Sequence, residues 1–397
     1  MDFIDLKTQQ QRIKSQLDAN IQKVLNHGGY IMGPEIKQLE QKLADYTGTK
    51  HAISCASGTD ALLMALMSYG VKPGDAIFTT PFTFIATAEV ISLLGATPVF
   101  VDTDPKTFNI DPVKLALAIK AVKSNDPSIH PLPKVLPLPP VGEGKGEGVI
   151  LRPRGIIPVD LFGLPADYDA ISSVAKEHGL FVIEDAAQSF GAQYKKKMSC
   201  ALADIACTSF FPAKPLGCYG DGGMCFTNDD KLAEIMESIR VHGKGNHKYD
   251  NVRIGINGRL DTLQAAILLA KFDIFPEEVE RRNEVAHRYN SLLAACKSLT
   301  TPRVPEGYIS VWAQYSLLAK NDDARTALLK KLQDSKIPTA IYYPKPLNRQ
   351  TAYAYLGYGE GAFSVSEDAA SRIFSLPMHP YLKEEDQKII ADTIGNA

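Results

Sequence analysis

Apolar and polar positions between about Asp75 and Asn228 follow one pattern, in which short apolar runs rich in β-branched residues alternate with amphipathic stretches. This alternation is typical of a parallel sheet covered by helices. The expected strands are Ala76–Thr80, Pro98–Val101, Gly155–Val159, Phe181–Ile183 and Ile205–Thr208. The pattern therefore predicts an α/β fold.

One segment interrupts this alternation. From about Lys123 to Arg154 the chain is dense in proline and then in alternating glycine, a composition typical of loops. The glycines lack the G-x-G-x-x-G spacing of a dinucleotide-binding loop and do not open a helix. We expect an exposed insertion between a helix and the strand that begins at Gly155.

The pattern changes again after about Arg240. A long helical stretch is expected from Arg259 to about Ala295, with Glu277–Glu278 and Arg281–Arg282 on its outer side. The segments Val311–Leu317 and Pro338–Tyr343 have strand character on either side of an expected helix, Asp323–Asp334. We therefore expect a large domain over residues 1–245 and a smaller α+β domain over residues 246–397.

Length and composition are consistent with a two-domain cytoplasmic enzyme. The chain has 397 residues, of which 45% are hydrophobic and 22% charged, and its formal net charge of -2 argues against nucleic acid as a partner. The N-terminus lacks the features of a signal peptide, and no apolar run is long enough to span a membrane. The six cysteines include no C-x-x-C pair, so we expect reduced thiols and no metal site.

Candidate chemistry lies directly after the expected strands, because ligands of such sheets gather beyond the carboxyl ends of the strands. Thr80–Phe82, Asp160, Glu184–Asp185 and Ser209 occupy these positions. We expect several of these side chains to converge on one site.

Lys214 lies between the strand end at Ser209 and the glycine-rich turn that ends at Gly223. Partial burial there would lower the pKa of its amine and make it a competent nucleophile for a Schiff base. A lysine in a turn is, however, more often an ordinary solvated residue.

Two further elements suggest a cofactor. Asp185 follows an apolar strand, where a buried carboxylate needs a partner such as a protonated pyridine nitrogen; a helix cap or a salt bridge is the alternative. The Cys55–Asp60 turn opens an apolar helix, whose free N–H groups favour a phosphate, with the Thr59 hydroxyl as a further donor. An ordinary helix cap explains this turn equally well.

Four ordered motifs together resemble the DegT/DnrJ/EryC1/StrS family of sugar aminotransferases, which depend on pyridoxal phosphate (PLP). The motifs are Ser57–Leu62, Ile183–Ser189, Ser209–Lys214 and Gly255–Asp261. The resemblance covers the chain except the insertion. It implies fold type I of the PLP enzymes, with a mostly parallel sheet between helices in the large domain and a smaller α+β C-terminal domain.

The resemblance also implies roles for individual residues. Lys214 would hold PLP and move protons in both half-reactions, and Asp185 would face the pyridine nitrogen. The remaining cofactor residues would be Gly58, Thr59 and Ser209 at the phosphate, Gln188 near the ring 3-hydroxyl, and Phe84 stacked on the ring. In a homodimer with shared sites, Asn257 would reach the phosphate of the partner chain's cofactor and Arg259 would lie near the substrate. Alternatives are a helix cap for Asn257, a surface ion pair for Arg259 and a core position for Phe84.

Within the family, Phe3–Lys7, Thr208–Gly223 and Ser375–Leu382 are most similar to members that act on UDP-2-acetamido-2-deoxy-3-oxo-glucuronate with L-glutamate as donor, in the synthesis of bacterial surface polysaccharides such as the O-antigen of lipopolysaccharide. Arg259 suits this substrate because a guanidinium binds carboxylates in a bidentate manner. Tyr342 and Tyr343 are expected substrate contacts, although relatives commonly carry histidine in place of Tyr342. The alternatives are a 4-keto-6-deoxy nucleotide sugar and a non-catalytic PLP-binding regulatory protein.

Overall fold

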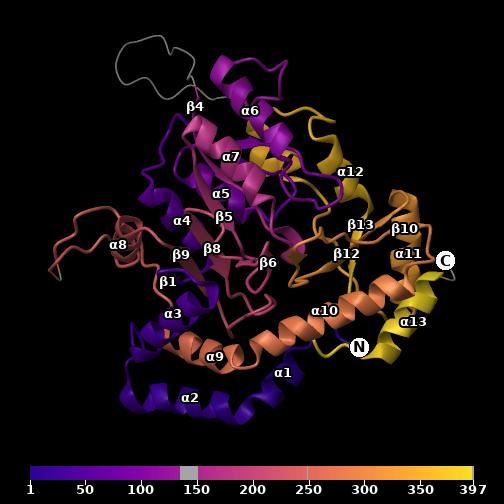
Figure 1. Cartoon of the computed structure of the whole chain (residues 1–397), viewed down its shortest axis with the longest axis horizontal. Helices are drawn as coiled ribbons and strands as arrows, with labels where there is room; N and C mark the ends of the chain where they lie inside the picture. The colour runs from indigo at the N-terminus through magenta and orange to yellow at the C-terminus, as the bar shows by residue number, and fades with distance from the viewer. Residues whose placement is uncertain (135–150, 248, 396–397) are drawn as a thin grey trace.

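A seven-stranded sheet lies at the centre of the N-terminal two thirds of the chain (Figure 1). The computed structural model describes residues 1–134, 151–247 and 249–395. In sheet order the strands are β1 (His51–Cys55), β9 (Gly223–Thr227), β8 (Ile205–Ser209), β5 (Phe181–Asp185), β4 (Arg152–Ile157), β2 (Asp75–Thr79) and β3 (Thr97–Phe100). The five strands from β8 to β3 are parallel, and β9 is antiparallel to both of its neighbours. The α/β fold and all five expected strands are confirmed.

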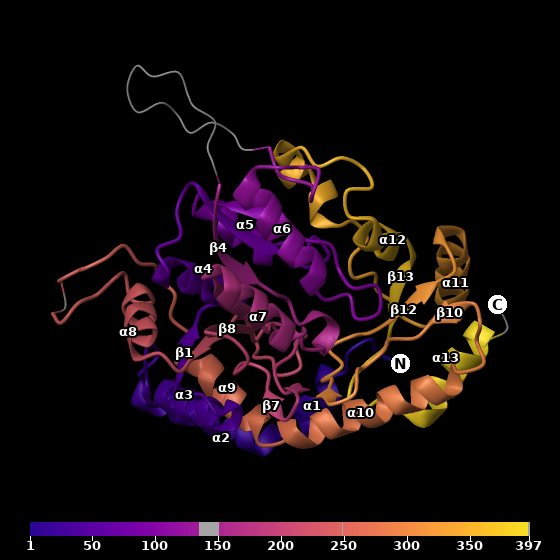
Figure 2. The ribbon, with the colours of Figure 1, turned by 45° about the horizontal axis from the view of Figure 1, so that its top comes forward.

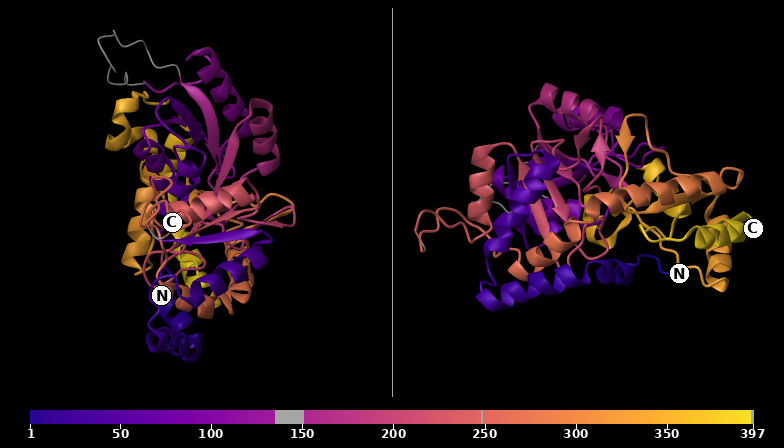
Figure 3. Two further views of the ribbon diagram at one scale, coloured as in Figure 1. Left: turned by 90° about the vertical axis from the view of Figure 1, so that its left-hand side faces the viewer. Right: turned by 60° about the horizontal axis from the view of Figure 1, so that its bottom comes forward.

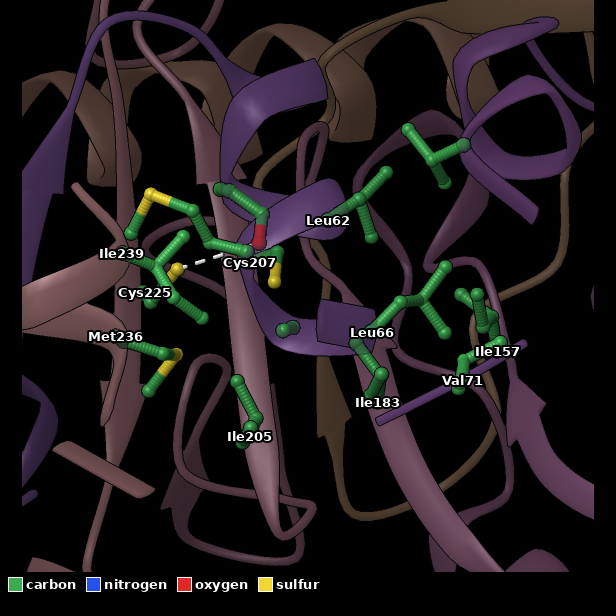
Figure 4. Close-up of a cluster of buried hydrophobic side chains, with 14 of the residues drawn as sticks. Leu62, Leu66, Val71, Ile157, Ile183, Ile205, Cys207, Cys225, Met236 and Ile239 are labelled. Atoms are coloured by element: carbon green, nitrogen blue, oxygen red, sulfur yellow. Dashed lines mark hydrogen bonds between the residues drawn. The ribbon is translucent and has the colours of Figure 1, made fainter. Parts of the chain in front are cut away.

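Helices cover both faces of this sheet (Figure 2). One face packs against α4 (Gly58–Ser68), α5 (Ala86–Leu93) and α8 (Asp230–Ile239). Figure 4 shows Leu62 and Leu66 of α4 above Ile183, Ile205 and Cys207. The other face packs against α3 (Pro34–Thr47), α6 (Pro112–Ser124), α7 (Tyr168–His178) and α9 (Thr262–Phe272). Alternate residues along each strand thus enter different cores.

A second body of structure follows the long helix α10 (Phe275–Leu292), which extends away from the large sheet in Figures 1 and 2. Its antiparallel sheet has the order β10 (Leu299–Thr300), β12 (Tyr315–Ala319) and β13 (Ile373–Leu376). This sheet shares a core with α10, α11 (Asp322–Asp334) and α13 (Glu384–Gly395), while α12 (Ser364–Arg372) precedes β13. The expected helix Asp323–Asp334 is confirmed.

Smaller elements complete the chain. The N-terminal helices α1 (Leu6–Arg12) and α2 (Lys14–His27) follow one another along the lower edge of the molecule, as Figure 3 shows on its right. A small sheet has the order β11 (Tyr308–Ile309), β6 (Gln193–Tyr194) and β7 (Lys197–Met198). The short 3₁₀ helices are η1 (Leu161–Gly163), η2 (Leu347–Arg349) and η3 (Thr351–Leu356). Within the described ranges, no helix is both long and apolar enough to cross a bilayer.

Two strand predictions in the C-terminal region are wrong, one in its starting residue and one altogether. The strand expected from Val311 begins only at Tyr315, because the residues before it bond to the η1 turn instead of a sheet: Val311 N donates to Gly163 O at 3.0 Å. In the segment 338–343 only one isolated bridge forms, between Ala340 and Ser375. The apolar character of both segments reflects burial against other loops and the C-terminal sheet.

The expected helix from Arg259 to Ala295 is in fact two helices, α9 and α10, which are separated at Asp273–Ile274. The prediction that both charged pairs lie on the outer side is also wrong in part. Glu278 and Arg282 are buried, with 2% and 5% exposure, because they bond to the N-terminal helix and the C-terminal loops. Gln9 Nε2 donates to Glu278 Oε2 at 2.8 Å, and Arg282 Nη1 donates to Trp312 O at 3.1 Å.

The described residues on both sides of the expected insertion pack against the rest of the molecule. Residues 135–150, including the alternating glycines, lie outside the described residues. On one side of them the chain packs onto the body, since His130 Nε2 lies 2.8 Å from Phe100 O and Lys134 N donates to Leu356 O at 2.8 Å. On the other side β4 begins at Arg152, earlier than the expected Gly155, because Arg152 pairs with Asp75 of β2.

Candidate active site

The carboxyl ends of two neighbouring parallel strands, β5 and β8, carry the central groups of the candidate site. Asp185 ends β5 and lies opposite Cys207 of β8, so Ser209, the last residue of β8, extends two residues further. Lys214 follows in the turn that leads to β9. The structure thus brings the three residues to the same edge of the sheet.

Asp185 is buried, with 4% exposure. Thr87 Oγ1 donates to its Oδ2 at 2.7 Å, and Ala187 N donates to its Oδ1 at 3.2 Å. Burial raises the pKa of Asp185, while these hydrogen bonds and the charge of Lys214 act in the opposite direction. The carboxylate is therefore fixed in orientation and would gain from a cationic partner. Thr87 had no signal in the sequence, because it contacts Asp185 only through the fold.

Burial lowers the pKa of Lys214, and the charge of Asp185 opposes that shift. The turn around it is tight: Lys214 N donates to Phe211 O at 2.8 Å, and a Cβ on Gly217 would lie 2.6 Å from the same oxygen. A desolvated amine spends more time neutral and is a better nucleophile. The expectation that this lysine is partly desolvated is consistent with its surroundings.

The first turn of α4 lies against the ends of β8 and β9. Ser57 caps the helix, accepting a hydrogen bond from Asp60 N at 3.0 Å, so the N–H groups of Gly58 and Thr59 are at its open end. A Cβ on Gly58 would lie 2.7 Å from Ser209 Cβ, and a Cβ on Gly223 would lie 2.3 Å from Ser57 O. The absence of side chains at both glycines lets the helix N-terminus and the Ser209 hydroxyl share one small space, a suitable place for a phosphate.

Gln188, Tyr343 and Phe84 lie next to one another. Gln188 is buried; its Oε1 accepts a hydrogen bond from Phe162 N at 2.8 Å, and its Nε2 donates to the Tyr343 hydroxyl at 3.1 Å. The ring of Tyr343 lies 6.5 Å from that of Phe84. Phe84 is 55% exposed, which is a position open to a flat ligand and not a core position.

Tyr342 is half-buried and faces the start of the chain: its ring lies 6.4 Å from that of Phe3. The N-terminal residues therefore lie beside the expected substrate contacts. Phe3 was noted in the sequence only through the resemblance, and the contact with Tyr342 depends on the tertiary structure.

Asn257 and Arg259 lie in an extended segment beside α4. Gly258 between them accepts a hydrogen bond from Ala56 N at 3.0 Å and donates one to Arg240 O at 3.0 Å. The Asn257 side chain is exposed, and it does not cap a helix. Within the described residues, Arg259 Nε is buried without a hydrogen-bond partner, so this guanidinium retains an unused donor.

Not every residue at a strand end faces this site. Several of the side chains that follow the strands were expected to converge, but Asp160 and Glu184 point into a separate, fully buried polar cluster with Ser189 and Ser199. Because side chains alternate along a strand, Glu184 and Asp185 of β5 project to opposite sides.

The groups at the strand ends fit pyridoxal phosphate. The buried carboxylate of Asp185 suits a protonated pyridine nitrogen, the amine of Lys214 suits an aldehyde, and the glycine-lined N-terminus of α4 suits a phosphate. No group of at least three histidine, cysteine or acidic residues in the described ranges could hold a metal ion.

Comparisons with known proteins agree with this geometry. A family model described as the DegT/DnrJ/EryC1/StrS aminotransferase family matches residues 11–395. The chain is 48% identical to the UDP-2-acetamido-2-deoxy-3-oxo-D-glucuronate aminotransferase of Pseudomonas aeruginosa, over 100% of both chains.

Two solved structures extend the comparison to the fold. A DegT DnrJ EryC1 StrS aminotransferase from Brucella abortus superposes with a TM-score of 0.91 at 48% identity, covering 100% of this chain and 99% of that one. NtdA from Bacillus subtilis, solved with its bound cofactor PMP, superposes with a TM-score of 0.82 at 27% identity, covering 100% and 83%.

Proposed function

We propose, from the premise that this chain belongs to the DegT/DnrJ/EryC1/StrS aminotransferase family, that it transfers the amino group of L-glutamate to C3 of UDP-2-acetamido-2-deoxy-3-oxo-D-glucuronate. The chain is a PLP-dependent nucleotide-sugar aminotransferase of fold type I. The observation that carries the more specific proposal is the full-length similarity to the Pseudomonas enzyme, together with an arginine that has an unused donor.

When bound, pyridoxal phosphate supplies an aldehyde carbon that carries the amino group and a ring that withdraws electrons from the reacting carbon of the substrate. Lys214 would hold the cofactor and then, because burial lowers the pKa of its amine, accept a proton from the substrate carbon and return it. Asp185 would hold the pyridine nitrogen protonated, and Thr87 would keep that carboxylate in place.

The phosphate would bind at the N-terminus of α4, between Gly58, Thr59 and the Ser209 hydroxyl. Phe84 would stack on one face of the ring, since its side chain is exposed beside Tyr343. Gln188 would approach the ring 3-hydroxyl with its amide, and Tyr342 and Tyr343 would border the sugar.

We also propose that the active enzyme is a homodimer. Residues 241–247 and 249–257 form a segment that projects from the body beside α8 (Figures 1 and 2), and Val252 and Ile254 on it are 55% and 86% exposed. Such apolar side chains are suited to contact with a second copy. Asn257 would then reach the partner's cofactor phosphate, and Arg259 would bind the carboxylate of glutamate or of the uronate in turn.

A substrate panel tests the proposal. The purified holoenzyme is mixed with L-glutamate and three acceptors: UDP-2-acetamido-2-deoxy-3-oxo-glucuronate, its neutral analogue with a hydroxymethyl group in place of the carboxylate, and a dTDP-4-keto-6-deoxy hexose. We expect amino sugar and 2-oxoglutarate from the uronate, at a kcat/KM about a hundredfold above that for the neutral analogue, because an unpaired guanidinium is costly to leave in the site.

Arg259→Lys keeps the positive charge but loses the bidentate geometry. We expect this variant to lose most of the preference for the uronate over its neutral analogue. Turnover of the dTDP sugar in place of the uronate would replace the proposed substrate with the alternative one. The amino uronate formed would serve the synthesis of a bacterial surface polysaccharide.

A further inference from the structure

Four polar side chains behind the active site form one continuous chain of contacts. Asp160 Oδ2 lies 2.8 Å from Ser189 Oγ, Ser189 Oγ lies 2.6 Å from Ser199 Oγ, and Ser199 Oγ lies 2.9 Å from Glu184 Oε1. All four residues have 0% exposure. We refer to Asp160, Ser189, Ser199 and Glu184 as the carboxyl–serine chain.

The number of protons in this chain is set by its contacts. Each of the three oxygen–oxygen contacts is of hydrogen-bond length and needs one proton, but the two serine hydroxyls supply only two. The third proton must come from a carboxyl group. All three hydrogen bonds of the carboxyl–serine chain can therefore form only when the two carboxyl groups together hold one proton.

Hydrogen-bond geometry places that proton on Asp160. Both oxygens of Glu184 already accept backbone N–H groups, from Cys200 at 2.7 Å and from Leu202 at 3.0 Å. Asp160 Oδ2 contacts only serine hydroxyls, whereas its Oδ1 accepts from Ala166 N and from the Tyr168 hydroxyl, both at 2.9 Å. Donation can then run in one direction, from Asp160 through Ser189 and Ser199 to Glu184.

Electrostatics favour one shared proton for the pair, while its position on Asp160 rests on the hydrogen-bond geometry. The titratable groups that face the two carboxyls are Tyr168 from α7 and Cys200 after β7, and neither is a cation. Burial raises the pKa of both Asp160 and Glu184, and the charge of Asp160 raises the pKa of Glu184 further. A second negative charge is thus unfavourable, which agrees with the single proton that the three oxygen–oxygen contacts require.

The carboxyl–serine chain is joined to the active site through Gln188. Ser189 directly follows Gln188, and its bond to Asp160 joins the 185–189 loop to the turn that begins at Asp160. The same turn supplies Phe162 N, which donates to Gln188 Oε1 at 2.8 Å. With this oxygen engaged, the Gln188 Nε2 side points toward Tyr343. Asp160 is thus bonded to the residue after Gln188 and begins the turn whose Phe162 N–H bonds the Gln188 amide. It links the two segments that orient this amide.

We propose that Asp160 is a positioning residue for Gln188, and that it acts as the proton-carrying end of the carboxyl–serine chain. The inference rests on the proposed function in one respect, namely that Gln188 contacts the cofactor ring. The proton in the chain is a property of the protein alone and can be tested without cofactor.

The first experiment is infrared spectroscopy of the cofactor-free protein at pH 8 in D2O, where exposed carboxyls are ionised. A protonated buried carboxyl gives a carbonyl stretch separate from the carboxylate bands. We expect Asp160→Asn to remove the intensity of one carboxyl group, because the remaining Glu184 then ionises. The control is Asp102→Asn, since Asp102 is also buried, but hydrogen bonds from Ser366 and Val365 and the ion pair with Lys114 outweigh burial and lower its pKa. An unchanged band in Asp160→Asn would overturn the shared proton.

The second experiment compares Asp160→Asn with Asp160→Ala in the holoenzyme. Asparagine can donate to Ser189 and accept from Ala166 N and Tyr168 as the protonated acid does, so the pH dependence of the cofactor absorption band should match that of the wild type. Alanine removes these contacts, and we expect a shifted pH dependence and a kcat about tenfold lower with little change in KM. Ser189→Ala gives the same readout if Asp160→Ala does not fold.

Gln188→Ala is the reference that separates the two proposals. If it does not move the pH dependence of the band, the proposed contact between Gln188 and the ring is wrong. The infrared experiment then still decides, independently, whether the carboxyl–serine chain holds a proton. If Gln188→Ala moves it but Asp160→Ala and Ser189→Ala only lower the melting temperature, the two residues are merely structural and the positioning role is overturned.

Discussion

At the residue scale, the same side-chain type acts differently according to the groups around it. Asp185 and Glu184 are neighbours in the sequence and both are buried, yet one faces Lys214 and Thr87 and the other faces Ser199 and two backbone N–H groups. Period-two alternation along β5 assigns one carboxyl to the site and the other to the carboxyl–serine chain. The sequence motif contains both carboxyls, but it does not show which of them faces the site. That depends on which face of β5 is turned toward the site.

His379 gives a prediction at this scale. It is 4% exposed. Burial and the charge of Arg282 lower the pKa of His379 to about 4, whereas an unfolded histidine titrates near 6.5. Between these values the unfolded state binds the proton and the folded state does not. Stability is therefore lost as the pH falls, by about 1.5 kcal/mol between pH 6.5 and 5 from this residue.

Urea unfolding at both pH values checks this expectation. His379→Leu should reduce the loss of unfolding free energy on acidification by about that amount, because the titrating group is gone. His287→Gln, at an exposed position, should leave the loss unchanged. An equal acid sensitivity in His379→Leu and the wild type would show that His379 does not titrate in this way.

At the element scale, the site depends on how closely a helix and two strand ends approach. The N-terminus of α4 can meet the end of β8 because Gly58 has no side chain there, and it can meet β9 because of Gly223. The sequence predicts the helix and the turn residues, but the partner of each glycine is known only from the sheet order.

Gly58→Ala tests this approach. Its Cβ would lie 2.7 Å from Ser209 Cβ, so Ser209 must move away from the phosphate space, and we expect PLP affinity to fall about tenfold. The loss of affinity is measured by fluorescence titration of the cofactor-free protein. Gly359→Ala is the matched control, since a Cβ there meets nothing within 4 Å. An unchanged dissociation constant in a folded Gly58→Ala protein would contradict this account of the phosphate space.

At the scale of the whole molecule, exposed apolar residues gather in two segments near the site. Tyr30, Ile31 and Met32 follow α2 with 39–51% exposure, and Val252 and Ile254 lie on the projecting segment. An isolated antiparallel β-bridge between Ile31 and Asp261 brings the first of these segments beside the extended segment that contains Asn257 and Arg259. A surface of this kind is consistent with a second copy that completes each site.

Mixed dimers test whether the sites are shared. Lys214→Ala and Arg259→Ala should each be inactive or nearly so alone. If each site takes Lys214 from one chain and Arg259 from the other, an equal mixture reassembled from monomers should recover about a quarter of wild-type activity, because half of the dimers contain one intact site of two. No recovery in reassembled mixed dimers would place both residues in the site of one chain.

The sequence by itself determined the α/β class, the five parallel strands and the family, because these depend on local apolar patterns and on short motifs such as Ser57–Leu62 and Ser209–Lys214. Only the tertiary structure decided which polar side chains at the strand ends face one another. It paired Thr87 with Asp185, joined Asp160 to Glu184 away from the site, and turned the apolar run at Val311 into a buried loop. The physical reason is that these contacts join residues far apart in the chain, whose distances are set by sheet order and packing and leave no periodic signal in the sequence.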